Sequence, residues 1–231
     1  KDMAGEQSVE QVVIRRYRPD DAARVKAITE AAFAPVSIDA AVDRRWPGVA
    51  PVPWIERKWA SMQPQLADHP EHCWVAEAAQ PFPEGGPHPS PLPEGEGRGA
   101  AGSGNNEAGG GVRGGEVVGY VTCEVLPNLG LGRIPDLAVD ARWRGRGLGR
   151  RLLEHALTSF RELRLPLAKI ETLAHNEVGR HLYPSLGFEL VATQYHYIMP
   201  LGPVEPPVHG GPRAAGGAAA PPSAVDEREE G

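Results

Sequence analysis

The sequence predicts an α/β (α+β) fold in a single domain, with a mixed central sheet and helices on both of its faces. Three observations support this prediction. Short apolar, β-branched runs alternate with amphipathic helical segments. The later part of the chain follows a strand–helix–strand order, which is typical of βαβ crossovers. Glycine and proline are concentrated in two segments, so the rest of the chain has the composition of an ordinary packed core.

The two segments rich in glycine and proline set the domain organisation. Gln80–Gly115 contains 12 glycines and 6 prolines in 36 residues, and Gly202–Gly231 is rich in glycine, alanine and proline. Such segments bury too little apolar surface to offset the entropy of ordering them. We therefore expect one domain over Val9–Leu201, interrupted by a flexible insertion over residues 80–115 and followed by a disordered tail over residues 202–231.

Charge and cysteine content exclude several classes of protein. The net charge of −6 disfavours a dedicated nucleic-acid binder, which is more often basic. Cys73 and Cys123 lie in apolar runs without metal-ligand spacing, so we expect reduced, buried thiols in a cytoplasmic protein and no metal site. The chain has no apolar stretch of about 18 residues and no secretory signal, so we expect no association with membranes.

The expected strands are short apolar runs bounded by turn residues. In chain order they are Gln11–Arg18, Cys73–Ala79, Val117–Leu126, Arg133–Asp140, Ala168–Ala174 and Glu189–Met199, the last of which Pro200 would end.

The expected helices have apolar residues at helical spacing. The first is capped by Asp20 and runs to Phe33, with Val25, Ile28 and Ala32 on one face. The others are Pro53–Leu66, in which Pro64 weakens the last turn, Leu148–Arg161, and Glu177–Leu186, which Gly187 closes.

The segment Asp140–Arg151 carries the clearest chemistry, because it joins a strand to a helix through a glycine-rich turn. Its glycines stand at positions 145, 147 and 149, and its arginines at positions 142, 144, 146, 150 and 151. Glycines allow close approach of the backbone, and a helix N-terminus adds partial positive charge, so the segment predicts a site for a phosphate-bearing ligand. The dinucleotide pattern fails because Arg150 occupies its last glycine position, and the Walker A pattern is absent.

Two separate motifs identify the ligand more closely. Arg144–Gly149 reads R-x-x-G-x-G, and Asn176–Phe188 reads N-x₂-G-x₃-Y-x₃-G-F, with Leu137–Val139 (L-x-V) ahead of the loop. Together they resemble the acetyl-CoA site of the GNAT superfamily. The resemblance implies a mostly antiparallel sheet and an acyl-CoA-dependent N-acetyltransferase that passes an acetyl group from acetyl-CoA to a small-molecule or peptide amine. Its departures from the family pattern are the long insertion and glycine in place of a small residue such as alanine at position 179.

The resemblance also implies how the cofactor is held. The strand with Leu137–Val139 would splay from Ala168–Ala174, and the pantetheine arm would lie in the gap; Pro135 fits such an edge or bulge. Asn176 would position the cofactor, although a helix N-cap is an equally natural role for it. The residues expected to bind the cofactor are Leu137, Ala138, Val139, Arg144, Gly145, Arg146, Gly147, Leu148, Gly149, Arg150 and Asn176.

The catalytic residues are inferred in the same way. Tyr183 would be the general acid that protonates the CoA thiolate. A carboxylate would take the proton of the amine, either directly or through water; the candidates are Asp136, which we favour slightly, Glu124 and Glu171. Since neither cysteine lies in the motifs, we expect the amine to attack the thioester directly in a ternary complex.

The acceptor is not identified by the sequence. In this family the first two helices and their loop build the acceptor pocket, and here Ala34–Pro53 and the residues just after it offer aromatic and acidic side chains that could hold a cation. These are Asp39, Asp43, Trp46, Trp54 and Trp59. Two other functions are weighed, a non-catalytic acyl-CoA-binding sensor and, less favoured, an arginine-loop nucleic-acid-binding module, and the sequence leaves a homodimer open.

Overall fold

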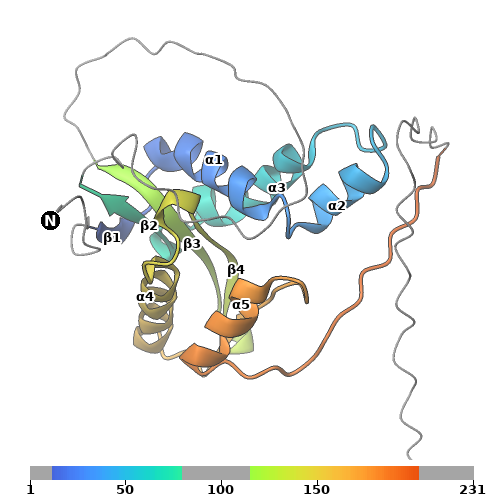
Figure 1. Ribbon diagram of the computed structural model, residues 1–231. Coiled ribbons are helices and arrows are strands. Elements are labelled where there is room, and N and C mark those ends of the chain that lie inside the picture. The colour runs from blue at the N-terminus through green and yellow to red at the C-terminus, as the bar shows by residue number, and fades with distance from the viewer. Residues whose placement is uncertain (1–11, 80–114, 203–231) are drawn as a thin grey trace, which may run out of the picture.

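The computed structural model describes residues 12–79 and 115–202 (Figure 1). The strands are β1 (Val12–Arg16), β2 (Cys73–Ala78), β3 (Glu116–Leu126), β4 (Leu131–Val139) and β5 (Leu167–Ile170). The helices are α1 (Ala22–Phe33), α2 (Ile38–Arg45), α3 (Trp54–Gln63), α4 (Leu148–Glu162) and α5 (Glu177–Leu182). A π-helical turn over Pro64–Asp68 extends α3, and short 3₁₀ turns lie at Pro19–Asp21, Pro70–His72, Pro127–Leu129, Ala141–Trp143 and Pro184–Leu186.

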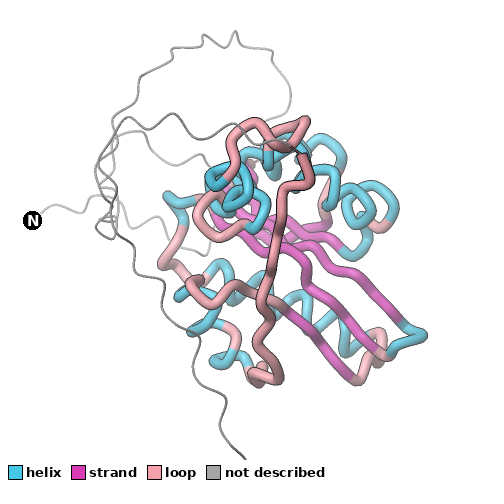
Figure 2. The backbone as a smooth tube through the Cα atoms, turned by 90° about the vertical axis from the view of Figure 1, so that its right-hand side faces the viewer, coloured by secondary structure: helices cyan, strands magenta, loops and turns pink. Residues whose placement is uncertain are grey.

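The five strands form one sheet in the order β1-β2-β3-β4-β5. Neighbouring strands from β1 to β4 are antiparallel, and β4 and β5 are parallel. Helices α1–α3 lie on one side of this sheet, whereas α4 and α5 lie on the other (Figures 1 and 2). The predicted mixed sheet with helices on both faces is therefore confirmed.

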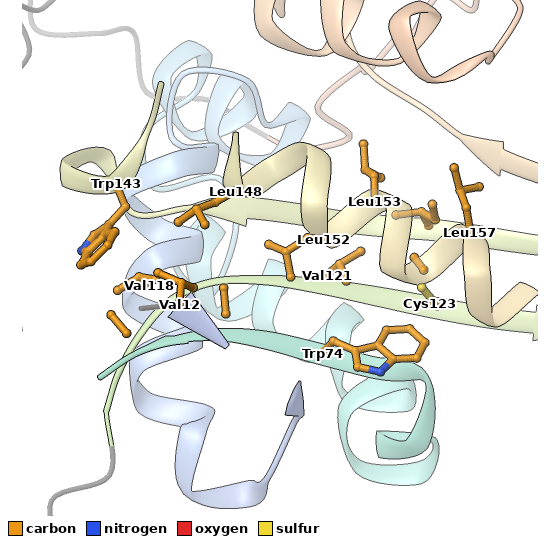
Figure 3. Close-up of a cluster of buried hydrophobic side chains, with 14 of the residues drawn as sticks. Val12, Trp74, Val118, Val121, Cys123, Trp143, Leu148, Leu152, Leu153 and Leu157 are labelled. Atoms are coloured by element: carbon orange, nitrogen blue, oxygen red, sulfur yellow. The ribbon is translucent and has the colours of Figure 1, made fainter. Parts of the chain in front are cut away.

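Helix α4 covers one face of the sheet through a stripe of leucines, alanine and phenylalanine. Leu152 and Leu153 are completely buried, in one cluster with Val121 and Cys123 of β3 (Figure 3). Burying a leucine side chain stabilises the fold by about 1.5–3 kcal/mol, so this one helix holds a large share of the core. The spacing of these residues predicted the helix to within one residue at its C-terminus.

A second apolar cluster lies between the other face of the sheet and helices α1 and α3. Val25 and Ile28 of α1 and Met62 of α3 are buried there against β2 and β3. The cluster contains one buried polar pair, the hydroxyl groups of Thr29 and Tyr120, whose oxygens are 2.6 Å apart. Burial raises the pKa of Tyr120 well above its ordinary value, so this hydroxyl stays protonated.

A bulge in β4 decides which face of the sheet each of its side chains reaches. Thr122 is opposite Asp136 and Glu124 is opposite Arg133, so β4 has one residue more than β3 between these two pairs. Pro135 lies within this irregularity, where a missing N–H costs least. Ile134 packs in the cluster under α4, but Asp136, two residues later, faces α3 and pairs with Lys58.

The prediction of a final strand over residues 189–199 is wrong. The stretch leaves the end of α5 and runs away from the sheet as an extended chain (Figure 1), and it pairs with no strand among the described residues. Leu190, Val191 and Tyr197 are about nine-tenths exposed. The sequence pattern was right about an extended backbone and wrong about the sheet, because alternation of side chains does not determine whether an edge lies within hydrogen-bonding reach.

Four smaller expectations also change. Strand β5 ends at Ile170, so residues 171–174 continue as irregular chain. Helix α2 was not expected within the loop that follows α1; its signal is Ser37, whose Oγ accepts from the backbone N–H of Ala40. Asp21 rather than Asp20 holds the start of α1, because its carboxylate accepts from the backbone N–H of Arg18. Pro64 ends α3 and begins the π-helical turn.

The predicted insertion and tail lie outside the described residues, except for Gly115 and Gly202 at their ends. Ala78 and Glu116 are register partners, and the N–H of Gly115 donates to Oε1 of Glu77 at 2.6 Å. The two ends of the insertion are therefore neighbours in the sheet, at the position of a hairpin turn. Within the two described ranges, none of the helices has the length and apolar character needed to cross a membrane.

Candidate functional site

The first feature of the site is a separation of β4 from β5. The two strands pair from Leu131 and Leu167 to Ile134 and Ile170, and no further pairs follow in the described chain. Beyond Ile134, β4 continues to Val139 and pairs only with β3. One edge of residues 137–139 therefore faces a gap in the sheet, as the predicted splay requires.

The loop after β4 is shaped by two glycines in the left-handed region of backbone conformation. Gly145 has φ 73° and Gly147 has φ 77°, and Gly147 is the N-cap of α4. A Cβ built at either position meets nothing within 4 Å. The requirement for glycine here is therefore conformational, and open space lies in front of the loop where a ligand can approach the backbone.

The start of α4 supplies donors to that space. The first hydrogen bond of the helix is from the N–H of Arg151 to the carbonyl of Gly147 at 3.1 Å. Amides ahead of Arg151 in the first turn cannot find a carbonyl within the helix, because the helix begins there. With the dipole of this 15-residue helix behind them, they form a site suited to an anion.

The five arginines of the loop divide into two groups. Arg142 is paired with Asp140 and Glu116, and Arg151 donates to the carbonyl of Val12 at 2.8 Å. These two arginines hold the loop and the helix to the sheet.

The other three arginines, at positions 144, 146 and 150, surround the loop. Nε of Arg144 donates to the carbonyl of Val139 at 3.2 Å, and the guanidinium of Arg146 lies 5.4 Å from the ring centre of Trp143. Arg150 donates to Oγ of Ser185 at 2.5 Å. They contribute positive charge around the same open space.

Helix α5 brings Asn176 and Tyr183 to this face of the sheet. Oδ1 of Asn176 accepts from the N–H of Gly179 at 3.3 Å, so Asn176 is the N-cap of α5, one of the two roles expected for it. A contact between Asn176 and a cofactor remains a prediction.

Tyr183 is half-buried against the α4 cluster. Its ring meets Phe188 edge-to-face at 6.2 Å between ring centres. Burial raises the pKa of Tyr183, and the nearby hydroxyl of Thr172 partly opposes this rise. The phenol is therefore protonated at neutral pH, as a proton donor must be.

Asp136 lies on the opposite face, two residues beyond the last pair of β4 with β5. Its side chain is 2% exposed, it pairs with Nζ of Lys58, and Oγ1 of Thr122 is 3.4 Å from Oδ2. The structure thus places Asp136 and Tyr183 on opposite faces of the sheet.

The other two carboxylates proposed as bases are engaged elsewhere. Glu124 accepts from Nε of Arg133 at 2.6 Å, within the paired part of the sheet. Glu171 pairs with Lys169 at 3.0 Å on the surface. Glu124 thus lies away from the gap, whereas Glu171 directly follows Ile170, the last residue of β5 that pairs with β4.

The expected acceptor carboxylates are used within the helical layer. Asp43 pairs with Arg57 at 2.8 Å and accepts from the N–H of Trp54 at 2.7 Å, and Asp39 lies 3.4 Å from Nε of Arg57. Trp46 instead lines a cavity of about 470 Å³ between α2 and the chain after β5. The cavity is lined by Ile38, Ala41, Val42, Arg45, Trp46, Leu173, His196, Tyr197 and Ile198.

The two cysteines are buried and away from the loop. Both are free thiols. Burial raises the pKa of Cys73 to about 11 and raises that of Cys123 further. Protonated, inaccessible thiols are poor nucleophiles.

Sequence reasoning missed Lys58 and Thr172. Lys58 stands at a helical position that predicts only packing, and Thr172 falls outside both motifs. Only the folded chain shows that Lys58 pairs with Asp136 and that Thr172 accepts a hydrogen bond from Asn176.

The end of the β4–β5 pairing lies beside a glycine-rich helix start that can hold a phosphate-bearing ligand. Residues 83–188 match the model of the acetyltransferase (GNAT) family. The matched segment is just under half of the chain, so the chain is similar to the GNAT acetyltransferase family over that segment.

Two curated proteins share part of this sequence. N-acetylaspartate synthetase from Rattus norvegicus is 34% identical over 91 residues, which cover 37% of this chain and 29% of the relative. Mycothiol acetyltransferase from Nocardiopsis dassonvillei is 36% identical over 70 residues, which cover 30% of this chain and 21% of the relative. The match thus spans less than a third of the length of either curated relative.

Solved structures share the fold. A GCN5-related N-acetyltransferase from Ralstonia eutropha JMP134 aligns over 81% of this chain and 98% of its own, with a TM-score of 0.51 and 21% identity. The PaiA N-acetyltransferase from Thermoplasma acidophilum, solved in complex with coenzyme A, aligns over 79% and 92%, with a TM-score of 0.50 and 12% identity. At these identities the likeness concerns the fold alone.

Proposed function

We propose that this protein transfers an acetyl group from acetyl-CoA to an amine by direct attack of the amine in a ternary complex. The observation that carries the proposal is the opening of β4 from β5 beside the left-handed glycines at the start of α4. One end of this site offers amides to a diphosphate, and the other offers an unpaired strand edge to an amide-containing arm.

The cofactor's pyrophosphate would lie on the loop formed by residues 144–150, held by main-chain N–H groups and by the nearby arginines. The fit is supported by the open space in front of Gly145 and Gly147, which side chains would fill. Backbone groups of residues 137–139 would pair with the pantetheine amides. A nucleic-acid-binding patch needs arginines, but it does not need left-handed glycines at the start of a helix. An acyl-CoA ligand therefore explains both the arginines and the glycines of the loop.

In the reaction, the amine nitrogen attacks the thioester carbonyl, a C–N bond forms and the C–S bond breaks. Tyr183 gives its phenolic proton to the leaving sulfur. Asp136 takes the proton of the amine, because it is the candidate base beside the gap on the face opposite Tyr183. In the absence of substrate, the carboxylate of Asp136 pairs with Lys58.

The relatives guide the choice of acceptor. The name of one relative contains an acetylated amino acid, and that of the other an acetylated thiol-containing metabolite. An amine panel should therefore include aspartate beside peptide N-termini, polyamines and aminoglycosides. We also propose a cytoplasmic location, which the two free thiols support.

The decisive experiment follows thiol release from acetyl-CoA with that panel, and measures CoA binding by calorimetry. We expect Tyr183→Phe to lower kcat at least tenfold and to leave CoA affinity nearly intact, whereas Tyr195→Phe, a change at an exposed tyrosine, has no effect. An unchanged rate in Tyr183→Phe would remove this residue from the mechanism. Binding of CoA without transfer to any amine would favour an acyl-CoA sensor instead.

A further inference from the structure

Asp140 is the first residue after β4, and its side chain holds the turn that follows it. Oδ1 of Asp140 accepts from the backbone N–H of Arg142 at 2.9 Å and from Nε of the same arginine at 3.2 Å. The backbone N–H of Asp140 donates to the carbonyl of Val118 at 2.8 Å, so this residue is itself fixed to β3. The carboxylate is therefore the N-cap of the 3₁₀ turn Ala141–Trp143, which leads into the loop of residues 144–150.

The other carboxylate oxygen of Asp140 belongs to a ring of ion pairs. Oδ2 lies 3.0 Å from Nη2 of Arg142 and also pairs with Nη2 of Arg24 on α1. Both guanidinium groups reach Oε1 of Glu116 at the start of β3, at 2.9 Å for Arg24 and at 2.6 Å for Arg142. The Asp140 side chain is 11% exposed, so dissolved salt screens these pairs less than it screens pairs on the surface. Two carboxylates and two arginines thus balance each other's charge and join α1, β3 and the end of β4.

The turn held by Asp140 also contains the residue that anchors the loop in the core. The backbone N–H of Trp143 donates to the carbonyl of Asp140 at 2.9 Å, and Trp143 is 1% exposed in the cluster under α4. The guanidinium of Arg146 lies 5.4 Å from the ring centre of Trp143. In the sequence, Gly145 therefore stands between two residues whose positions are linked to Asp140, Trp143 directly and Arg146 through the indole.

We propose that Asp140 is a positioning residue for acyl-CoA binding, because it holds the loop of residues 144–150 in the conformation that receives the diphosphate. Asp140 acts through the turn and the ring of ion pairs, without contacting the cofactor. A loop that is ordered before its ligand arrives loses less conformational entropy on binding, so the ligand binds more tightly. This inference rests on the proposed function, and it explains why an acidic residue precedes a segment that is otherwise cationic.

The first test measures CoA binding by calorimetry, without any amine. Asp140→Ala removes both the cap and the ion pairs, so we expect the Kd for CoA to rise about tenfold, the worth of one hydrogen bond to a charged group. Asp140→Asn keeps an oxygen that can cap the turn but loses the ion pairs, so its Kd should rise about threefold. The direction of the change is decisive, because loss of a negative charge near the loop would by itself strengthen the binding of a diphosphate.

The second test compares acetyl-CoA with acetylpantetheine, an acyl donor that lacks the diphosphate. Asp140→Ala should raise the KM for acetyl-CoA about tenfold, change kcat less than about twofold, and leave the KM for acetylpantetheine nearly unchanged. Asp21→Ala is the matched control, because Asp21 also holds an arginine and a backbone N–H, those of Arg15 and Arg18, but lies at the start of α1. It should change neither KM, and circular dichroism at the assay temperature verifies that both variants are folded.

The outcomes separate this inference from the function on which it rests. An unchanged or lower Kd for CoA in the Asp140 variants overturns the positioning role, and if Asp140→Ala does not fold, Asp140→Asn decides by the same measurements. Equal increases in KM for the two donors would also contradict the inference, because the loss would then not come from the diphosphate loop. If CoA affinity falls as expected but no amine is acetylated, the positioning role stands and the acetyl-transfer proposal fails.

Discussion

The ammonium of Lys58 on α3 pairs with the carboxylate of Asp136 on β4, in the interior between the helices and the sheet. Lys58 also lies 5.0 Å from the ring centre of Phe33. The pair ties α3 to the part of β4 that has lost β5 as a neighbour. The packing of α3 against the sheet therefore depends in part on the charge of Asp136, the proposed base.

Removing only one member of this pair should be costly. Lys58→Met leaves the Asp136 carboxylate buried without its cation, and we expect a loss of about 3 kcal/mol in the free energy of unfolding. The double variant Lys58→Met, Asp136→Leu should recover most of this loss, because it buries no charge. Urea denaturation of the wild type and the variants measures both effects, and a double variant as unstable as the single one would contradict the explanation.

The left-handed glycines of the loop allow a matched comparison. Gly147→Ala and Gly48→Ala both place a Cβ at positive φ, 77° and 76°, with nothing within 4 Å. Each should cost about 1–2 kcal/mol in stability. Only Gly147→Ala should weaken CoA binding, at least tenfold by calorimetry, because only that Cβ enters the proposed phosphate site. Equal CoA affinity in the two variants would count against the loop as the binding site.

The Asp21 carboxylate should make stability depend on acid pH. Burial by itself would raise its pKa, but hydrogen bonds from Arg15, both at 2.8 Å, and from the N–H of Arg18 outweigh burial and lower the pKa. A carboxyl with a lowered folded pKa contributes stability above its unfolded pKa of about 4 and loses it as the pH falls through the folded pKa.

Asp21→Asn should therefore cost about 2 kcal/mol at pH 7 and progressively less below pH 4. Urea titrations at pH 7 and pH 3 measure the difference. The neighbouring exposed carboxylate provides the control, since Asp20→Asn should have little effect at either pH. A cost of Asp21→Asn that does not shrink in acid would show that the loss comes from packing and not from charge.

The pairing of Ala78 with Glu116 predicts that the insertion can be shortened. Replacing residues 80–114 by Asn-Gly keeps the hairpin position and lowers the entropic cost of closing the loop on folding. The free energy of unfolding should therefore rise by about 1–2 kcal/mol. CoA affinity should be unchanged, because the loop of residues 144–150 is untouched. A shortened chain that no longer folds would show that the insertion contributes contacts to the domain.

The sequence predicts the parts of the fold whose burial pattern is local. The leucine stripe of α4 and the apolar runs of β2 and β3 are read from spacing alone. Pairing is not local, which is why residues 189–199 have the pattern of a strand and yet no strand partner in the described chain. Helix α2 was missed because its eight residues contain few large apolar side chains, and Ser37 was its main signal.

The candidate site divides in the same way. The glycines of the loop and the tyrosine of α5 belong to motifs, so they are visible in the sequence. The partner of Asp136 is Lys58, which comes from another element and can be identified only in the folded chain. Alternation along the strand predicts that Asp136 and Val139 point to opposite faces of the sheet. The face of Asp136 relative to the residues before Pro135 depends on the bulge, which only the structure shows.

That bulge makes the register of β4 sensitive to a change in chain length. The half of the strand before Pro135 sends Ile134 under α4, and the half after it sends Asp136 to α3. Straightening the strand without a change in chain length would put Ile134 and Asp136 on the same face, and so turn a carboxylate toward leucines or an isoleucine toward an ammonium. Removing the one extra residue would instead make them neighbours that keep their present faces, so related sequences without the bulge should be one residue shorter at this point.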